Sequence, residues 1–178
     1  MKSNKNNNLK LPKLGFGGAP IGNLFIDLND KEAEEILLEA KNSGINYFDT
    51  SPLYGCGLSE IRIGNFIKNY NREDFIISTK VGRYLEEVNN LDGINRGFFK
   101  SGLNFKTVLD YSYDGTMKSF EQSLNRLNTN YIDICLTHDV DYFNHKEKLD
   151  YYFDQSINGS YKAIRKLKEE KVIKAIGI

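Results

Sequence analysis

The chain has 178 residues, of which 40% are hydrophobic and 27% are charged, a composition typical of one globular domain with its own core. Its 24 basic and 24 acidic residues balance, so no excess of charge favours nucleic acid or a membrane surface as a partner. No apolar run suits a signal peptide or a membrane span, and Cys56 and Cys135 lack metal-ligand spacing. We therefore expect a cytoplasmic protein with reduced thiols and no bound metal.

Apolar runs and helical patterns alternate along the chain, and we interpret residues 1–178 as a single domain that begins with a polar tail at residues 1–8. The predicted strands are residues 9–23, 45–51, 74–81, 131–138 and 173–178. The predicted helices are residues 31–44, 59–70, 116–128 and 160–172. Asp30 is expected to cap the first helix and Gly44 to end it.

A chain that alternates strand and helix in this way builds a parallel sheet, so the class is α/β. The strand-helix unit is used about four and a half times, whereas a complete (β/α)₈ barrel typically needs about 250 residues. The 178 residues are therefore expected either to form part of such a barrel, about its first five strands and four helices, or to close their sheet in a way that the sequence does not disclose.

One segment, residues 82–114, interrupts the alternation. It combines glycines with Phe98, Phe99 and Phe105 among polar residues. Long segments without regular structure are uncommon in compact domains and often form lids or binding loops. We therefore predict a long active-site loop here.

Four polar side chains lie at the ends of predicted strands: Asp49 and Tyr54 in FDTSPLYG, Lys80 in STKVG and His138 in LTHD. The carboxyl ends of parallel strands share one face, so these residues are expected to meet there. Tyr54 could exchange a proton with a substrate oxygen, and the Lys80 ammonium, held by Asp49, would favour the phenolate. His138 could donate a hydrogen bond that orients the substrate oxygen.

Each of these residues also has an ordinary structural interpretation. Asp49 could form a turn, Tyr54 could be a half-buried surface ring, Lys80 could be solvated, and His138 could be a core histidine. Their joint placement on one predicted face favours the catalytic interpretation.

Other residues that could take part in chemistry give weaker signals. The GFGG sequence lacks the GxGxxG spacing of a dinucleotide fingerprint, and we expect Gly17 and Gly18 to allow a tight turn. Cys56 is expected to be a small packed thiol. His145 lies in the charged sequence DYFNHKEK and is expected to be solvated.

Several longer motifs, which nearly span the chain, together resemble the aldo-keto reductase family. They are LGFGGAPIGN, INYFDTSPLYGCGLSE, FIISTKVGR, YIDICLTHD and KVIKAIGI. Within the family, GGAPIGN, VLDYSYDGTMKSFEQSLNRL and THDVD resemble the branch that contains D-threo-aldose 1-dehydrogenases and pyridoxal 4-dehydrogenases.

The resemblance implies a (β/α)₈ barrel and an NADP- or NAD-dependent oxidoreductase that interconverts an aldose or another small alcohol with its carbonyl or lactone form. It implies a catalytic tetrad of Asp49, Tyr54, Lys80 and His138, with Tyr54 as general acid and base. It places Gly18 and Ala19 beside the nicotinamide ribose and makes Asp49 a further cofactor-binding residue. The loops that bind the rest of the cofactor in the family follow later strands than those predicted here.

A second interpretation is therefore kept open. In it, the 178 residues form a catalytically silent half-barrel or an interaction module that lacks the cofactor-binding part. The expected partners are a small carbonyl or sugar substrate and possible further copies of the chain, which would associate through the open edge of the sheet.

Overall fold

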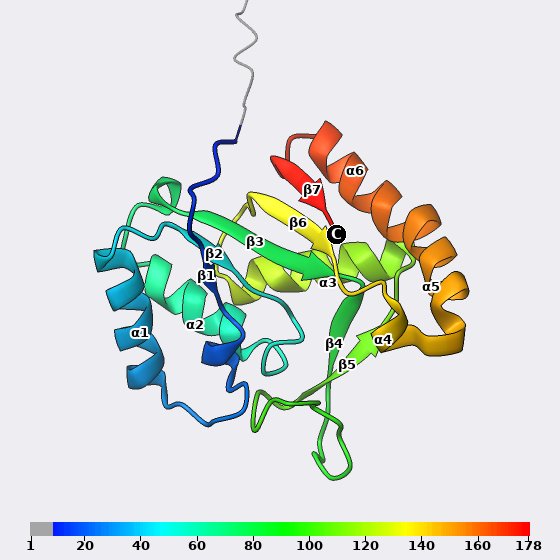
Figure 1. The fold of residues 1–178 in the computed structure, drawn as a ribbon, viewed down its shortest axis with the longest axis horizontal. Helices are drawn as coiled ribbons and strands as arrows, with labels where there is room; N and C mark the ends of the chain where they lie inside the picture. The colour runs from blue at the N-terminus through cyan, green and yellow to red at the C-terminus, as the bar shows by residue number, and fades with distance from the viewer. Residues whose placement is uncertain (1–8) are drawn as a thin grey trace, which may run out of the picture.

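The computed structural model of the protein describes residues 9–178, so the polar tail expected at residues 1–8 lies outside the described residues. Its centre is a parallel sheet of five strands that lie side by side in their order along the chain (Figure 1). The strands are β1 (Phe16–Gly17), β2 (Tyr47–Asp49), β3 (Ile76–Val81), β6 (Ile134–Thr137) and β7 (Ala175–Gly177). Each lies within a predicted strand segment, so this part of the prediction is confirmed.

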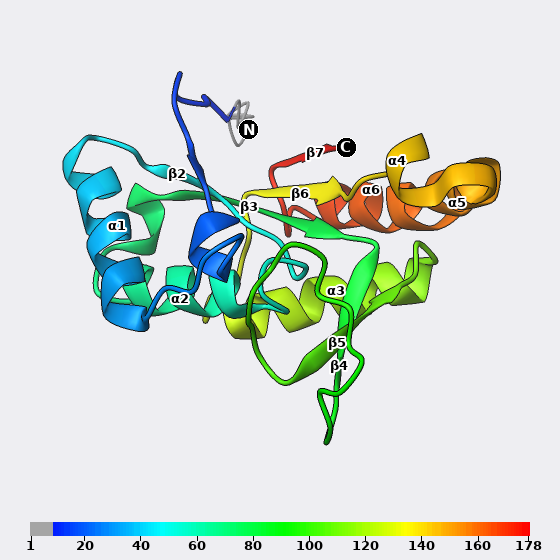
Figure 2. The same cartoon turned by 60° about the horizontal axis from the view of Figure 1, so that its bottom comes forward.

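Four longer helices follow the strands and lie on one side of the sheet. Figure 2 shows α1, α2 and α3 along this side, and α6 continues the layer beside β6 and β7. Their bounds are α1 (Asp30–Asn42), α2 (Leu58–Ile67), α3 (Tyr113–Arg126) and α6 (Tyr161–Glu169). Strands in chain order with helices on one face are the arrangement of a (β/α)₈ barrel, whereas doubly wound sheets carry helices on both faces. The predicted α/β class is confirmed.

Two of these helices begin earlier than predicted because of their caps. Asn29, not Asp30, caps α1: its side-chain oxygen accepts the Glu32 N–H at 3.0 Å, and the Glu32 carboxylate accepts the Asn29 N–H at 2.8 Å. This reciprocal capping box makes Asp30 the first helical residue. Ser112 caps α3 by accepting the Gly115 N–H, so α3 includes a turn that the apolar pattern did not reveal.

The connection between β6 and β7 contains more helix than the single one predicted. The additional elements are α4 (Tyr142–His145), α5 (Leu149–Gln155) and a π-helix, η4 (Ser156–Ser160), which runs directly into α6. None of the α5 residues is buried, and both Tyr151 and Phe153 are exposed, so α5 shows no amphipathic pattern to predict it. Short 3₁₀ turns complete the connections: η1 (Pro20–Gly22), η2 (Arg72–Asp74) and η3 (Lys146–Lys148).

The segment 82–114 is more ordered than a long loop. It contains a two-stranded antiparallel hairpin, β4 (Arg83–Glu87) and β5 (Phe105–Leu109), so the unstructured part is reduced to residues 88–104. The side chain of Gln122 on α3 fixes β4, since it accepts the Leu85 N–H and donates to the Leu85 carbonyl, each at 2.9 Å. Both strands mix charged and apolar residues, so the alternation of apolar and polar residues that predicts a strand is not visible in the sequence.

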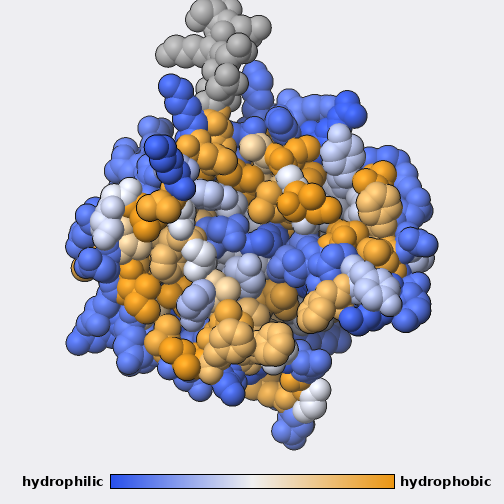
Figure 3. Space-filling model, viewed as in Figure 1, coloured by the Kyte–Doolittle hydropathy of each residue, from blue (hydrophilic) through white to orange (hydrophobic). Residues whose placement is uncertain are grey.

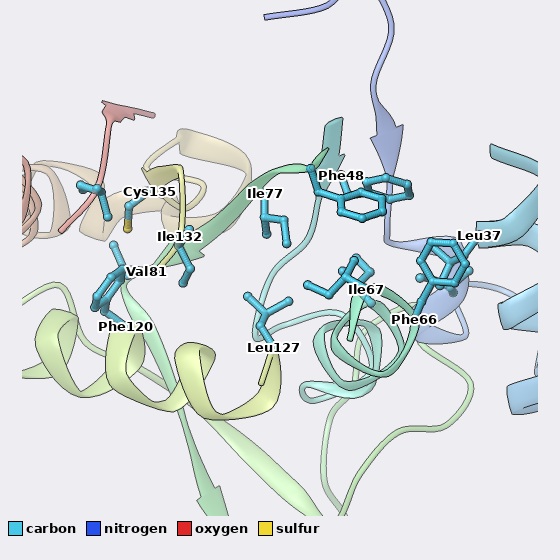
Figure 4. Close-up of a cluster of buried hydrophobic side chains, with 14 of the residues drawn as sticks. Leu37, Phe48, Phe66, Ile67, Ile77, Val81, Phe120, Leu127, Ile132 and Cys135 are labelled. Atoms are coloured by element: carbon cyan, nitrogen blue, oxygen red, sulfur yellow. The ribbon is translucent and has the colours of Figure 1, made fainter. Parts of the chain in front are cut away.

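The core lies between the sheet and the helices (Figure 4). Alternate strand residues, such as Phe48, Ile77, Val81 and Cys135, point toward the helices and are buried. Residues from α1, α2, α3 and α6 complete the cluster, among them Leu37, Phe66, Phe120, Leu127 and Ile164.

The intervening strand residues lie on the opposite face of the sheet, where Asp49, Lys80 and Leu136 remain partly exposed. Figure 3 shows hydrophilic residues near the middle of the molecule's face in that view, with hydrophobic patches around them. Across residues 9–178, no helix combines the length and the apolar character that crossing a membrane requires.

Candidate active site

The structure brings together all four residues predicted to be catalytic. Asp49 is the last residue of β2, Tyr54 lies in the turn that follows it, Lys80 is on β3, and His138 follows β6. Parallel pairing sets Asp49 beside Ser78 and Lys80 beside Leu136, so these strand ends reach the same edge of the sheet. The predicted clustering is confirmed, and the roles of the four residues remain to be argued from their contacts.

The Lys80 ammonium is the centre of the cluster. Its Nζ lies 2.6 Å from Asp49 Oδ2, 2.9 Å from the Thr50 carbonyl oxygen and 3.0 Å from the Tyr54 hydroxyl. An ammonium has three protons, and these three acceptors use them all. Burial acts to lower the Lys80 pKa, but the charges and hydrogen bonds of Asp49 and Tyr54 outweigh it and raise the pKa. Lys80 therefore stays positively charged beside the phenol.

Asp49 is fixed on its other side as well. Its Oδ1 accepts a hydrogen bond from the Ser78 hydroxyl at 2.5 Å, and that hydroxyl also lies 3.1 Å from the Tyr47 hydroxyl. Both carboxylate oxygens are thus engaged, so Asp49 holds Lys80 in place and cannot turn away without breaking two hydrogen bonds.

Two rings enclose Tyr54. Phe99, from the loop between β4 and β5, stacks on it with ring centres 5.8 Å apart and planes at 29°. The His138 ring stands edge-on at 6.0 Å and 85°. The loop that carries Phe99 is tied to the Tyr54 turn, since the Leu103 N–H donates to the Gly55 carbonyl at 3.0 Å. The 82–114 segment therefore supplies one wall of the site.

His138 is buried, with 5% of its surface exposed, and burial lowers its pKa. Its Nδ1 lies 3.1 Å from the Ser51 hydroxyl, and its Nε2 lies 3.0 Å from Asp139 Oδ2. The hydrogen bond from His138 lowers the pKa of Asp139, so that carboxyl is ionised at neutral pH.

A second buried group supports the His138 turn. The Tyr111 hydroxyl donates to the His138 carbonyl at 2.5 Å, and His145 Nε2 lies 3.1 Å from the same hydroxyl. Burial raises the pKa of Tyr111 to about 12, which keeps it a donor. The expectation that His145 is solvated is wrong, because α4 turns its ring inward to pack on Tyr111 and Tyr152, leaving 6% of the residue exposed.

The residues expected beside the cofactor lie on the same edge of the sheet. The Gly18 N–H donates to the Asp49 carbonyl at 2.7 Å, and its carbonyl accepts the Ser59 hydroxyl at 2.8 Å. A β-carbon on Gly18 would come within 2.7 Å of Ser59 Oγ, so close packing requires glycine here. Ala19 is half-buried. The Gly18 N–H is thus engaged within the protein and is not available to donate to a ligand.

The two thiols are packed, as predicted for Cys56. Cys56 and Cys135 are both free and buried. Burial raises the pKa of Cys56, although the nearby Arg96 opposes the shift, and burial also raises the pKa of Cys135. Neither thiol has the lowered pKa of a nucleophilic cysteine.

The fold and this constellation together define a class: (β/α)₈-barrel proteins with a tyrosine, a lysine, an aspartate and a histidine at the carboxyl ends of the strands. A model of the aldo/keto reductase family matches residues 13–178, and the chain belongs to this family.

Individual relatives agree with this assignment. The chain is 37% identical over 175 residues to a D-threo-aldose 1-dehydrogenase from Pseudomonas sp, covering 96% of this chain and 50% of the relative. It is 33% identical over 183 residues to a pyridoxal 4-dehydrogenase from Microbacterium luteolum, covering 96% and 52%. The resemblance to this branch is confirmed.

A solved structure, an aldo-keto reductase from Bacillus halodurans in its holo form, superposes with a TM-score of 0.68 at 31% identity, covering 93% of this chain and 45% of that one. The chain spans about half the length of the curated relatives it matches.

Proposed function

We propose that the protein is an NADP- or NAD-dependent oxidoreductase that interconverts an aldose or another small alcohol with its carbonyl or lactone form, and that Tyr54 is its general acid and base. The observation that carries the proposal is the 3.0 Å contact between the Lys80 ammonium and the Tyr54 hydroxyl. The names of the relatives, an aldose dehydrogenase and a pyridoxal dehydrogenase, support the substrate class.

The hydrogen bonds of Tyr54 support this role. Lys80 donates to the Tyr54 oxygen, so the Tyr54 proton is free to point toward a substrate oxygen. During reduction Tyr54 gives this proton to the oxygen of the carbonyl, and during oxidation it takes one from the substrate hydroxyl. The Lys80 charge, held by Asp49, stabilises the phenolate that remains after donation.

A bound nicotinamide would supply or accept the hydride at the substrate carbon. Gly18, Ala19 and Asp49 are the residues proposed to contact it. Space is open at the neighbouring Gly17, where nothing lies within 4 Å of a built β-carbon, and Asp49 keeps 28% of its side chain exposed. Gly17 pairs with Asp49, and Asp49 pairs with Ser78, two residues before Lys80, so this space lies on the face of the sheet that carries Lys80.

The proposal extends to assembly and location. The edge strand β7 pairs with β6 alone among the described strands, and Ile178 beyond it is 79% exposed. Exposed strand edges pair readily with other chains, so we propose that copies of the 178-residue chain associate through this edge. Two free, buried thiols are compatible with the reducing cytoplasm.

Substitution of Tyr54 by phenylalanine in the complete protein tests the proposal. Phenylalanine keeps the ring that packs on Phe99 and loses the hydroxyl that Lys80 contacts. Turnover of aldoses is expected to fall roughly 10²–10⁴-fold while affinity for NAD(P)H, followed by nicotinamide fluorescence, is preserved.

Tyr84→Phe is the matched control, because the Tyr84 hydroxyl contacts Glu86 on the hairpin and not the tetrad. Its turnover is expected to equal that of the wild type. Turnover of the Tyr54→Phe variant within a few-fold of wild type would exclude Tyr54 as the proton donor.

A further inference from the structure

We propose that Asp139 is a substrate-binding residue that accepts hydrogen bonds from the hydroxyl groups of a polyhydroxy substrate while His138 donates to the reacting oxygen. This proposal rests on the proposed function, since it names the group that would select sugars within the same site. Three observations support it: the backbone conformation of Asp139, the contacts of the His138 ring, and the partly exposed carboxylate of Asp139.

The backbone holds Asp139 in an unusual conformation. Its φ is +47°, in the left-handed region that residues other than glycine seldom adopt. The Tyr111 hydroxyl contacts the carbonyl oxygens of both His138 and Asp139, at 2.5 and 3.3 Å, and Arg83 donates to the His138 carbonyl at 3.3 Å. Backbone strain that buried side chains maintain in this way is concentrated at functional sites.

The groups around His138 indicate which ring nitrogen carries the proton. The ionised Asp139 carboxylate lies 3.0 Å from Nε2 and would repel a lone pair there, so Nε2 is assigned the proton. Burial keeps the ring neutral, which leaves Nδ1 as an acceptor for the Ser51 hydroxyl at 3.1 Å. Ser51 is itself held by the Leu53 N–H at 3.1 Å. His138 thus offers one donor, and that donor faces Asp139.

A substrate oxygen that accepts the Nε2 proton must come within hydrogen-bond distance of Nε2, and therefore beside Asp139. The Asp139 side chain is 41% exposed, and within residues 9–178 its Oδ1 has no hydrogen-bond partner. A carboxylate accepts from hydroxyls and cannot donate to a carbonyl, so it recognises the neighbouring hydroxyl groups and not the reacting C=O. Hydrogen bonds to a charged acceptor are stronger than those to a neutral one, so Asp139 could discriminate substrates that carry such hydroxyls from substrates that lack them.

The test is Asp139→Asn in the complete protein, assayed with two probes. L-fucose carries hydroxyls next to its reacting carbon, and benzaldehyde carries none. Asparagine tolerates a positive φ, so the turn is expected to be retained. We expect kcat/KM for L-fucose to fall roughly 10- to 100-fold, as for loss of a charged hydrogen bond, and kcat/KM for benzaldehyde to stay within about threefold of wild type.

Asp141→Asn is the matched control. Asp141 lies two residues further on, is exposed, and caps α4 by accepting the Asn144 N–H, which asparagine can also do. It should leave both probes unchanged. Equal losses of kcat/KM for both probes in Asp139→Asn would show that Asp139 only positions His138. No loss for either probe would show that Asp139 does not contact the substrate. Both results overturn the proposal.

A binding measurement separates this proposal from the proposed function. The ¹⁵N signals of the His138 ring should shift when L-fucose is added to the wild type and should not shift in Asp139→Asn. A wild type that turns over neither probe but shows this shift would refute the oxidoreductase proposal and keep Asp139 as a sugar ligand. A wild type that reduces benzaldehyde but shows no shift would support the oxidoreductase proposal and refute Asp139 as a sugar ligand.

Discussion

Replacement of Arg126 by leucine should destabilise the protein strongly, because it leaves a carboxylate buried without its cation. Glu60, at the start of α2, has 0% of its surface exposed. One of its oxygens accepts the Thr79 hydroxyl at 2.7 Å, and the other accepts Arg126 Nε at 2.6 Å. Arg126 is itself 11% exposed, so solvent screens the pair little. Removal of one partner of a buried pair typically costs about 3–5 kcal/mol, and the bond from Thr79 offsets only part of it.

The assay is urea-induced unfolding of the complete protein at pH 7, followed by circular dichroism. Glu60→Gln in the Arg126→Leu background removes the uncompensated charge and keeps the Thr79 contact, so the double variant should be more stable than Arg126→Leu alone. Glu169→Gln is the control: Arg165 and Glu169 are 2.8 Å apart but 60% and 62% exposed, and the unfolding midpoint should not change.

Two results would refute this reasoning. One is a loss of less than about 1 kcal/mol for Arg126→Leu, the range of exposed pairs. The other is a double variant no more stable than Arg126→Leu, since the cost would then not come from the unpaired Glu60 charge.

Three further predictions concern the catalytic face and the edge of the sheet. Burial lowers the pKa values of His138 and His145, so below about pH 6.5 the unfolded chain binds more protons than the folded one, and the free energy of unfolding should decrease as the pH falls. Thermal unfolding at pH 7.5 and 5.5 measures this effect, and an unchanged midpoint contradicts it. Deletion of residues 91–95 should change KM or substrate preference more than thermal stability, because that stretch is largely exposed whereas Phe99 borders the site; unfolding without a change in selectivity would make the loop structural. The 178-residue chain expressed alone should self-associate and bind NAD(P)H weakly, and a monomer on size-exclusion chromatography with micromolar affinity would disprove both.

The sequence was informative where local pattern and tertiary structure agree. Each strand of the parallel sheet lies in an apolar run, and Asp49, Lys80 and His138 lie where those runs end, so their clustering could be predicted from the sequence alone. The rest depends on pairings between distant segments. The stacking of Phe99 on Tyr54 requires a loop to return across the candidate active site, which no local pattern encodes.

His145 shows the limit most clearly. Its neighbours Lys146 and Glu147 are exposed and charged, so its surroundings in the sequence indicate solvent. Its burial comes from rings that lie elsewhere in the chain, Tyr111 and Tyr152. The β4–β5 hairpin was missed for a related reason, since only Leu85 of its residues is deeply buried and the alternation is correspondingly weak.

The π-helix between α5 and α6 should let this protein tolerate the deletion of one residue within Ser156–Ser160. A π-turn holds more residues than the 3.6 of an α-turn, and here the wider turn frees the Ser160 N–H to donate to the Tyr111 carbonyl at 2.8 Å. Loss of one residue at the exposed Ile157 would let the helix close to regular α geometry with α6 still facing the core, whereas the same loss within α6 would rotate the rest of that helix by about 100°. The deletion would, however, remove the hydrogen bond between the Ser160 N–H and the Tyr111 carbonyl, and with it one support of the turn that contains His138.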